Sequence, residues 1–159
     1  MKRKKIEIDI QSFTYEELNT SDRQLIDKAR KTNEHSYAPY SHFYVGAAVL
    51  LDNGEIICGS NQENAASPSG TCAERTALFY AGAKYPDQAV KTIAIAARND
   101  TEETEMPVPP CGACRQVLLE TEQRFHTPIR ILLYGKKEIL LLKSVNDLLP
   151  LSFGISFLK

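Results

Sequence analysis

The stretch "VKTIAIAARNDTEETEMPVPPCGACRQVLLETEQRFHTPIRILLY", residues 90–134, contains three successive elements. Residues 90–98 form an apolar run that predicts a buried strand. Residues 111–125 predict a helix, and the two prolines before it suit a helix start. Residues 128–134 predict another strand. A strand, a helix and a strand in this order favour a parallel pair joined by a crossover helix, so the stretch predicts an α/β domain.

The flanking sequence extends the same pattern. Residues 44–51 and 55–60 are strand-like runs joined by Asp52-Asn53-Gly54, a strong hairpin signal. Three further helices are predicted: one over residues 20–37, one over residues 72–83 and a short one over residues 144–150 that Ser144 opens. One more strand is expected near the C-terminus, at residues 138–143.

Length and composition describe one globular domain over residues 1–159, with residues 1–20 as an N-terminal arm. The net charge of −1 offers no basic field for nucleic acid or an anionic membrane surface. No apolar run approaches the roughly 20 residues that a membrane span needs. The basic start is not followed by an uninterrupted apolar core, so a secretory signal is not expected and the cytoplasm is the expected location.

The cysteines carry the chemical signal. Cys111 and Cys114 are spaced at i and i+3 at a helix start, where both sulfurs reach one ion and the helix N-terminus stabilises thiolate. The pair alone also fits a redox couple or part of a disulfide framework. Cys72 opens another helix, and a third thiolate with one position left for water favours a catalytic zinc site. Cys58, inside an apolar run, is interpreted as a small buried residue.

Charged residues surround these cysteines. Glu74 stands two positions after Cys72 and is poorly placed as a co-ligand, but it could move protons at the open metal position. The alternative is a favourable acid in a first helical turn. Arg75 and Arg115 each directly follow a key motif and could hydrogen-bond a cysteine sulfur. For both, the alternative is an arginine on a helix surface.

These motifs resemble the cytidine deaminase family, specifically its small homotetrameric branch. The similarity is carried by "TCAERTA" at residues 71–77 and "PCGACRQVLLE" at residues 110–120. The resemblance runs from about Ser21 to Gly154. Three further stretches support it: "YAPYSHFYVGAAVL" at residues 37–50, "GSNQENAA" at residues 59–66 and "LLPLSFG" at residues 148–154.

The resemblance implies a three-layer α/β/α fold with a mixed sheet of about five strands. It implies hydrolytic deamination of cytidine and deoxycytidine to uridine and deoxyuridine, with release of ammonia, for pyrimidine salvage. Zn²⁺ would be held by Cys72, Cys111 and Cys114, and Glu74 would be the proton shuttle. A free nucleoside would be the substrate, in a homotetramer with sites near the subunit interfaces.

The resemblance also implies the substrate contacts. Asn61 and Glu63 would bind the ribose, and Phe43 would form a pocket wall. Phe153 would be supplied to a neighbouring subunit's site, and Ala73 would contact the substrate. Without the resemblance, both aromatic residues would be read as core packing.

Two positions and the C-terminal tail stand out. Ser67 occupies a place where the family usually has an aromatic residue, and Tyr44 a place often held by proline. The apolar tail, residues 152–159, would be awkward if exposed on a monomer and favours burial at an interface.

Alternative functions keep the zinc site but change its use. One is deamination of a related, blasticidin-like aminonucleoside, although Asn61 and Glu63 favour an ordinary ribose. A nucleic-acid editor is disfavoured because the chain lacks a basic patch that could track a strand. A zinc-stabilised binding module without catalysis would not need Glu74 beside the ion.

Overall fold

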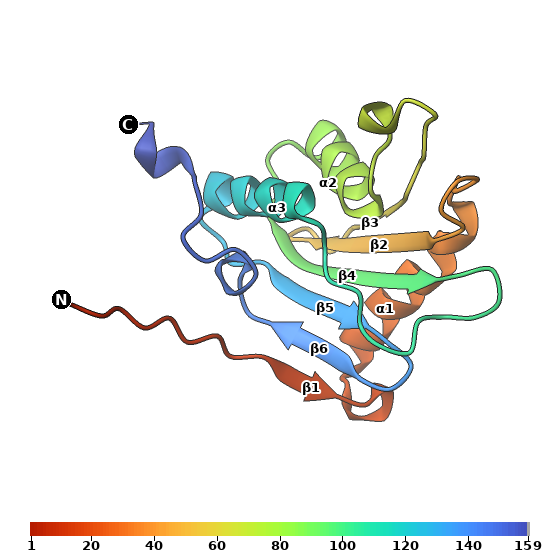
Figure 1. Ribbon diagram of the computed structural model, residues 1–159, viewed down its shortest axis with the longest axis horizontal. Helices are drawn as coiled ribbons and strands as arrows, with labels where there is room; N and C mark the ends of the chain where they lie inside the picture. Colours follow the sequence, from red (N-terminus) through yellow and green to blue (C-terminus); the bar gives the residue numbers. More distant parts are fainter. Residues whose placement is uncertain (159) are drawn as a thin grey trace.

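A computed structural model describes residues 1–158 and contains one six-stranded mixed sheet (Figure 1). The strand order is β1-β6-β5-β4-β2-β3. β4 and β5 are parallel, as the strand-helix-strand pattern predicted, and the other neighbours are antiparallel. The strands are β1 (Gln11–Phe13), β2 (Tyr44–Leu51), β3 (Ile56–Ser60), β4 (Val90–Arg98), β5 (Arg130–Tyr134) and β6 (Ile139–Leu142).

Three helices cover the two faces of this sheet: α1 (Thr20–Thr32), α2 (Ala73–Lys84) and α3 (Gly112–Phe125). Side chains of β4 alternate between the faces, as a strand requires. Ile93 and Ile95 join the core beneath α2 and α3, whereas Ala94 and Ala96 join the core beneath α1. The predicted three-layer α/β/α architecture is therefore confirmed, with six strands in place of about five (Figure 1).

The first helix is shorter than predicted. It ends at Thr32 and is followed by a 3₁₀ turn over Asn33–His35. Tyr37 then donates its backbone N–H to the Asn61 carbonyl at 3.0 Å, which ties this segment to the chain that follows β3. This hydrogen bond brings residues 37–43 beside the end of β3.

The two ends of the chain differ from the compact body. Residues 1–10 are exposed and extended, and β1 pairs with β6 at the sheet edge. At the C-terminus, Phe153 and Phe157 are exposed and stack with ring centroids 5.7 Å apart. The last residue of the predicted apolar tail, Lys159, lies outside the described part of the chain. Within residues 1–158, no helix combines the length and apolarity needed to cross a bilayer.

Gly59 sets the distance between α2 and the sheet. A Cβ at this position would lie 2.5 Å from the Ala77 nitrogen and 2.6 Å from the Ala73 oxygen. Such distances are too short for any side chain. Because glycine has none, the first turns of α2 lie directly on β3. This close approach places Cys72, at the start of α2, over the end of the sheet.

Candidate active site

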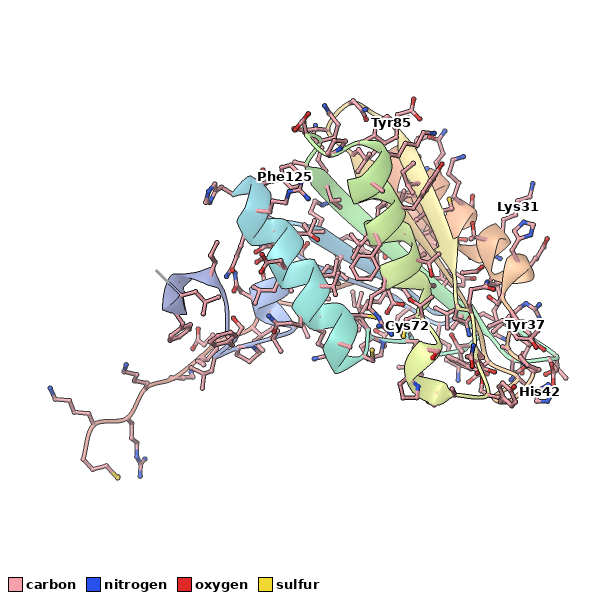
Figure 2. The ribbon with its side chains drawn as sticks, turned by 90° about the horizontal axis from the view of Figure 1, so that it is seen from above. Lys31, Tyr37, His42, Cys72, Tyr85 and Phe125 are labelled. Carbon is pink, nitrogen blue, oxygen red and sulfur yellow. The ribbon has the colours of Figure 1, made fainter. Side chains whose placement is uncertain are left out.

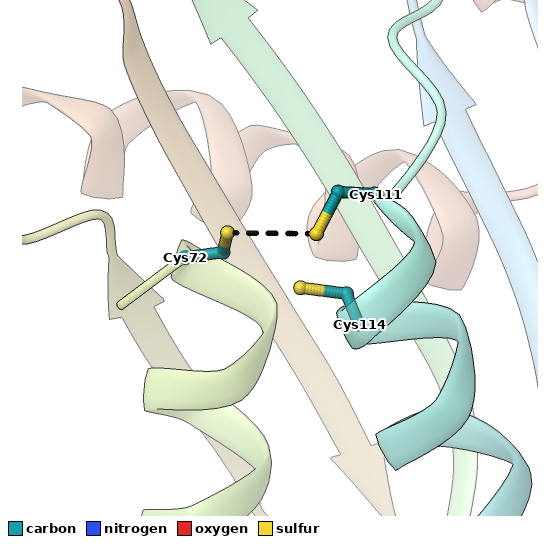
Figure 3. A group of neighbouring side chains, drawn as sticks. All are labelled: Cys72, Cys111 and Cys114. Atoms are coloured by element: carbon teal, nitrogen blue, oxygen red, sulfur yellow. Dashed lines mark hydrogen bonds between the residues drawn. The ribbon is translucent and has the colours of Figure 1, made fainter. Parts of the chain in front are cut away.

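Three cysteine sulfurs converge where α2 and α3 begin. Cys72 immediately precedes α2, Cys111 immediately precedes α3, and Cys114 lies in the first turn of α3. β3 and β4 run in the same direction because both are antiparallel to β2. The helices that follow them therefore start at the same edge of the sheet. Figures 2 and 3 show this arrangement, and the three sulfurs all lie within 4.8 Å of one another.

The spacing of the sulfurs fits a zinc ion. The Sγ atoms of Cys72 and Cys111 are 3.8 Å apart. Tetrahedral coordination with Zn–S bonds of about 2.3 Å separates two sulfurs by about 3.8 Å. Cys114 is buried, Cys72 is half-buried and Cys111 is exposed, so the cluster opens to solvent on one side.

The sulfurs also interact electrostatically. A hydrogen bond with the Cys114 thiol lowers the pKa of Cys72 to about 5, and Arg75 and Cys111 add to this effect. The same interaction with Cys72, together with burial, raises the pKa of Cys114. The cluster thus holds thiolate at Cys72 near neutral pH, and thiolate is the form that binds metal.

The two arginines that were predicted to hydrogen-bond a cysteine sulfur behave differently. An Arg75 guanidinium nitrogen lies 3.6 Å from the Cys72 sulfur and donates to it. Arg115 instead donates to the Pro110 carbonyl at 2.8 Å and to the Leu148 carbonyl at 2.6 Å. Within the described chain no hydrogen bond joins Arg115 to a sulfur. Because of these two bonds, Arg115 fastens the start of α3 to the C-terminal segment.

Glu74 is buried at the base of the site. Only 4% of it is exposed, although it lies in the first turn of a helix. Burial raises the pKa of its carboxyl group, and the nearby Cys72 adds to the shift. An acidic residue that only stabilises a helix N-terminus would remain exposed to solvent. The burial of Glu74 therefore argues against this alternative.

Glu74 shares a cavity of about 280 Å³ with two of the cysteines, Cys72 and Cys111. Phe43, Asn61 and Glu63 line the same cavity, so the structure brings these three predicted substrate contacts to the sulfur cluster. Five lining residues were not predicted from the sequence: Ser41, Val45, Ile95, Val108 and Pro109. Their neighbours in the chain, Phe43 and Cys111, were the available signal for four of them, while Ile95 reads only as core.

Asn61 and Glu63 are held by the chain segment that carries Phe43. The Asn61 side-chain oxygen accepts from the Val45 N–H at 2.8 Å, and its amide nitrogen donates to the Phe43 carbonyl at 2.9 Å. Glu63 accepts from the backbone N–H groups of Tyr40 at 2.9 Å and Ser41 at 3.3 Å. Hydrogen bonds from the Ser41 side chain and the Tyr40 backbone lower the pKa of Glu63. The carboxylate is therefore ionised at neutral pH.

Two predicted substrate contacts lie elsewhere. Ala73 is fully buried in the first turn of α2 and does not line the cavity, so its contact with the substrate stays a prediction. Phe153 is 60% exposed and its backbone oxygen accepts from Gln116 on α3, so it is outside the cavity of its own chain. A role for Phe153 in a neighbouring subunit stays a prediction.

A second cavity, of about 470 Å³, adjoins the first and shares Asn61, Glu63 and Cys72 with it. Ser67, at the position where an aromatic residue was expected from the resemblance, lines this second cavity together with Arg75. A separate apolar cavity of about 340 Å³ lies between α2 and α3 and is lined by other residues.

The interpretation of Cys58 as a buried residue was wrong, because its side chain is exposed. It lies on the edge strand β3, where its neighbours Ile57 and Gly59 face α2. Alternation therefore turns Cys58 to the opposite face, away from the sulfur cluster.

The comparisons with known proteins agree with this geometry. Residues 19–126 match the family model of the cytidine and deoxycytidylate deaminase zinc-binding region. A cytidine deaminase of Halalkalibacterium halodurans is 51% identical over 100 residues, which cover 62% of this chain and 71% of that protein. A cytidine deaminase of Mycobacterium tuberculosis is 34% identical over 123 residues, 76% of this chain and 80% of that protein. The crystal structure of cytidine deaminase from Burkholderia pseudomallei superimposes with a TM-score of 0.72 at 36% identity, covering 86% of this chain and 100% of that one.

Proposed function

The chain belongs to the cytidine and deoxycytidylate deaminase family, and we propose that it converts cytidine and deoxycytidine, with water, to uridine and deoxyuridine plus ammonia. One observation carries this proposal. Three sulfurs from two helix starts converge within 4.8 Å, and the buried Glu74 lines a cavity with two of them. Pyrimidine salvage is the role that such a reaction serves.

Zinc is the cofactor of this family, and Cys72, Cys111 and Cys114 are the residues that would hold it. Bound zinc supplies the Lewis acidity that makes water a nucleophile at neutral pH. The Arg75 guanidinium withdraws charge from the Cys72 sulfur through its hydrogen bond. Arg75 thereby offsets part of the negative charge of three thiolates.

Glu74 is the proposed proton shuttle. Its carboxylate accepts a proton from the attacking water and delivers it to ring nitrogen N3 of the cytosine. The oxygen of that water bonds to carbon 4, and Glu74 then moves its remaining proton to the amino group, so that the bond from carbon 4 to this nitrogen breaks and ammonia leaves. Burial of Glu74 in the cavity wall excludes bulk water from these transfers.

The sugar is bound by the residues opposite the sulfur cluster. In the described chain, Asn61 uses its oxygen and one amide hydrogen on the backbone of residues 43 and 45. A second amide hydrogen is left to donate to a sugar hydroxyl, while the Glu63 carboxylate accepts from one. Phe43 forms an apolar wall against the base.

We further propose a homotetramer in which a second copy covers the cavity that Ser67 and Arg75 line. Phe153 and Phe157 are exposed at the C-terminal end, and such an aromatic pair is suited to burial against another subunit. The proposed partners are thus a free nucleoside and other copies of the chain, with no nucleic acid and no membrane. The three ionisable thiols require a reducing compartment, which favours the cytoplasm.

A substrate panel with metal analysis on the same sample tests the proposal. Purified protein should contain about one zinc per chain and release ammonia from cytidine and deoxycytidine, with the matching change in ultraviolet absorbance. A blasticidin-like aminonucleoside and cytosine in single-stranded DNA complete the panel. Zinc-loaded protein that leaves both nucleosides unchanged at high enzyme concentration contradicts the proposed function.

A further inference from the structure

His42 has an unusual backbone conformation directly before the cavity wall. Its φ angle is +54°, in the left-handed region that residues with a Cβ rarely adopt. Its neighbours in the chain, Ser41 and Phe43, both line the catalytic cavity. A strained conformation of this kind persists only where surrounding contacts hold it, so the contacts of this segment become informative.

Asp100, in the loop that follows β4, holds the segment from outside. One Asp100 carboxylate oxygen accepts from the Tyr44 hydroxyl at 2.8 Å, and the other lies 3.3 Å from Nδ1 of His42. The Arg98 guanidinium also stacks over the Tyr44 ring, 4.3 Å from its centroid. Arg98, the last residue of β4, and Asp100, in the loop after it, therefore both hold Tyr44 at the start of β2, and Asp100 also contacts His42 two positions earlier.

The contacts with Asp100 lie on either side of Phe43 in the chain. His42 and Tyr44 point toward Asp100, and Phe43 between them points into the cavity. A clamp on the two outer residues therefore fixes the orientation of the inner one.

The backbone of the same segment supports both proposed sugar-binding residues. Asn61 is bonded to the Phe43 carbonyl and the Val45 N–H, and Glu63 to the Tyr40 and Ser41 N–H groups. Any displacement of residues 40–45 would move the amide and the carboxylate that face the sugar.

We propose that Asp100 and Tyr44 are positioning residues, which hold residues 40–45 so that Phe43, Asn61 and Glu63 form the nucleoside-binding wall. The inference rests on the proposed nucleoside deaminase function for its kinetic consequence, but the clamp itself is a property of the fold. Neither residue lines the cavity, so their effect is exerted through the segment that they hold.

The test compares Asp100→Ala, Asp100→Asn and Tyr44→Phe with the wild type. Loss of one or two hydrogen bonds should raise KM for cytidine about three- to tenfold, with kcat within about twofold and zinc content unchanged. Asp100→Asn keeps one oxygen that accepts from Tyr44, so its KM should lie between those of the wild type and Asp100→Ala. Asp52→Asn is the matched control, since Asp52 pairs with Lys91 at 2.9 Å in the turn between β2 and β3.

Amide hydrogen exchange provides a readout that is independent of turnover. Residues 40–45 should exchange faster in Asp100→Ala and Tyr44→Phe, and at the wild-type rate in Asp52→Asn. Unchanged exchange in these residues overturns the clamp, and unchanged KM or a fall in kcat alone overturns its role in nucleoside binding. If the wild-type protein does not deaminate cytidine, the proposed function fails, and the exchange rates still decide whether Asp100 holds the segment.

Discussion

The sulfur atoms of Cys72 and Cys111 lie 3.8 Å apart, although 39 positions separate the two residues in the chain. Each residue precedes a helix, and each helix follows a strand that ends at the same edge of the sheet. The arrangement joins two helix N-termini, which favour thiolate, to a buried carboxylate and a cavity that is large enough for a nucleoside base.

Removal of a sulfur from the cluster should remove the metal. Cys72→Ala leaves two sulfurs, so bound zinc should fall from about one per chain to near zero. Cys58→Ala is the control, because Cys58 is exposed on β3 outside the cluster. Metal analysis after gel filtration measures both, and undiminished zinc in Cys72→Ala would refute the assignment.

Replacement of the proposed proton shuttle should separate metal binding from turnover. Glu74→Gln preserves shape but cannot accept a proton, so kcat should fall about 10²- to 10⁴-fold while zinc content stays unchanged. Glu120→Gln, at an exposed position of α3, should keep wild-type turnover. A near-normal rate for Glu74→Gln in a cytidine assay would exclude Glu74 from proton transfer.

Two glycine substitutions should have opposite effects on stability. Gly59→Ala places a Cβ 2.5 Å from the Ala77 nitrogen and should lower the free energy of unfolding by about 1–3 kcal/mol or more. Gly82→Ala, inside α2, meets nothing within 4 Å and should raise it by up to about 1 kcal/mol through helix propensity. Urea unfolding distinguishes these outcomes, and equal effects would show that the contact at Gly59 is not limiting.

Glu122 should be a stability determinant without a catalytic role. One of its buried carboxylate oxygens accepts from the N–H groups of Ile129 at 2.9 Å and Val145 at 3.0 Å. The other accepts from the Ser144 hydroxyl at 2.7 Å. Glu122→Ala should cost about 1–3 kcal/mol for each buried group left unpaired.

Glu122→Gln, which keeps one acceptor oxygen, should cost less than Glu122→Ala. Chemical denaturation of both variants measures the difference. Equal stability of Glu122→Ala and the wild type would show that these bonds contribute nothing net.

Tyr134 should make stability depend on alkaline pH. Burial, together with nearby Glu103, raises the pKa of Tyr134 from 10.0 to about 12. The folded protein therefore retains the phenol proton where the unfolded chain loses it. The contribution of the neutral phenol is complete below the unfolded pKa and is lost as pH rises from about 10 to about 12.

The measurement is the unfolding free energy of wild type and Tyr134→Phe as a function of pH. The advantage of the wild type should shrink across that range, because phenylalanine has no proton to lose. A constant difference between the two proteins at every pH would contradict the shifted pKa.

Much of the fold follows from local sequence patterns. Residues 44–51 and 90–98 were predicted as strands with the bounds that β2 and β4 have, because short apolar runs of this length are typical of buried strands. The first helix was predicted too long. The last residue of the predicted helix, Tyr37, instead bonds to the chain after β3. A contact with a distant segment produces no periodic pattern in the local sequence.

The pocket was only partly predictable. Val108 and Pro109 line the cavity, and Asp100 clamps its wall, yet all three belong to the loop between β4 and α3, where no site residue was predicted from the sequence. Arg75 and Arg115 occupy similar places after their motifs, but only Arg75 contacts a sulfur in the described structure. Side-chain direction at a helix start depends on the packing partner, which the motif does not specify.

The sequence by itself determined which elements form and which residues can carry chemistry: Cys72, Glu74, Cys111 and Cys114. These features are local, since they depend on periodicity and on ligand spacing within one helix. That the two helix starts meet was also expected from the cysteines, but only the tertiary structure decided that Phe43, Asn61 and Glu63 face them across one cavity. That outcome depends on the strand order and on the close contact at Gly59, because residues far apart in the chain meet only when the sheet has assembled.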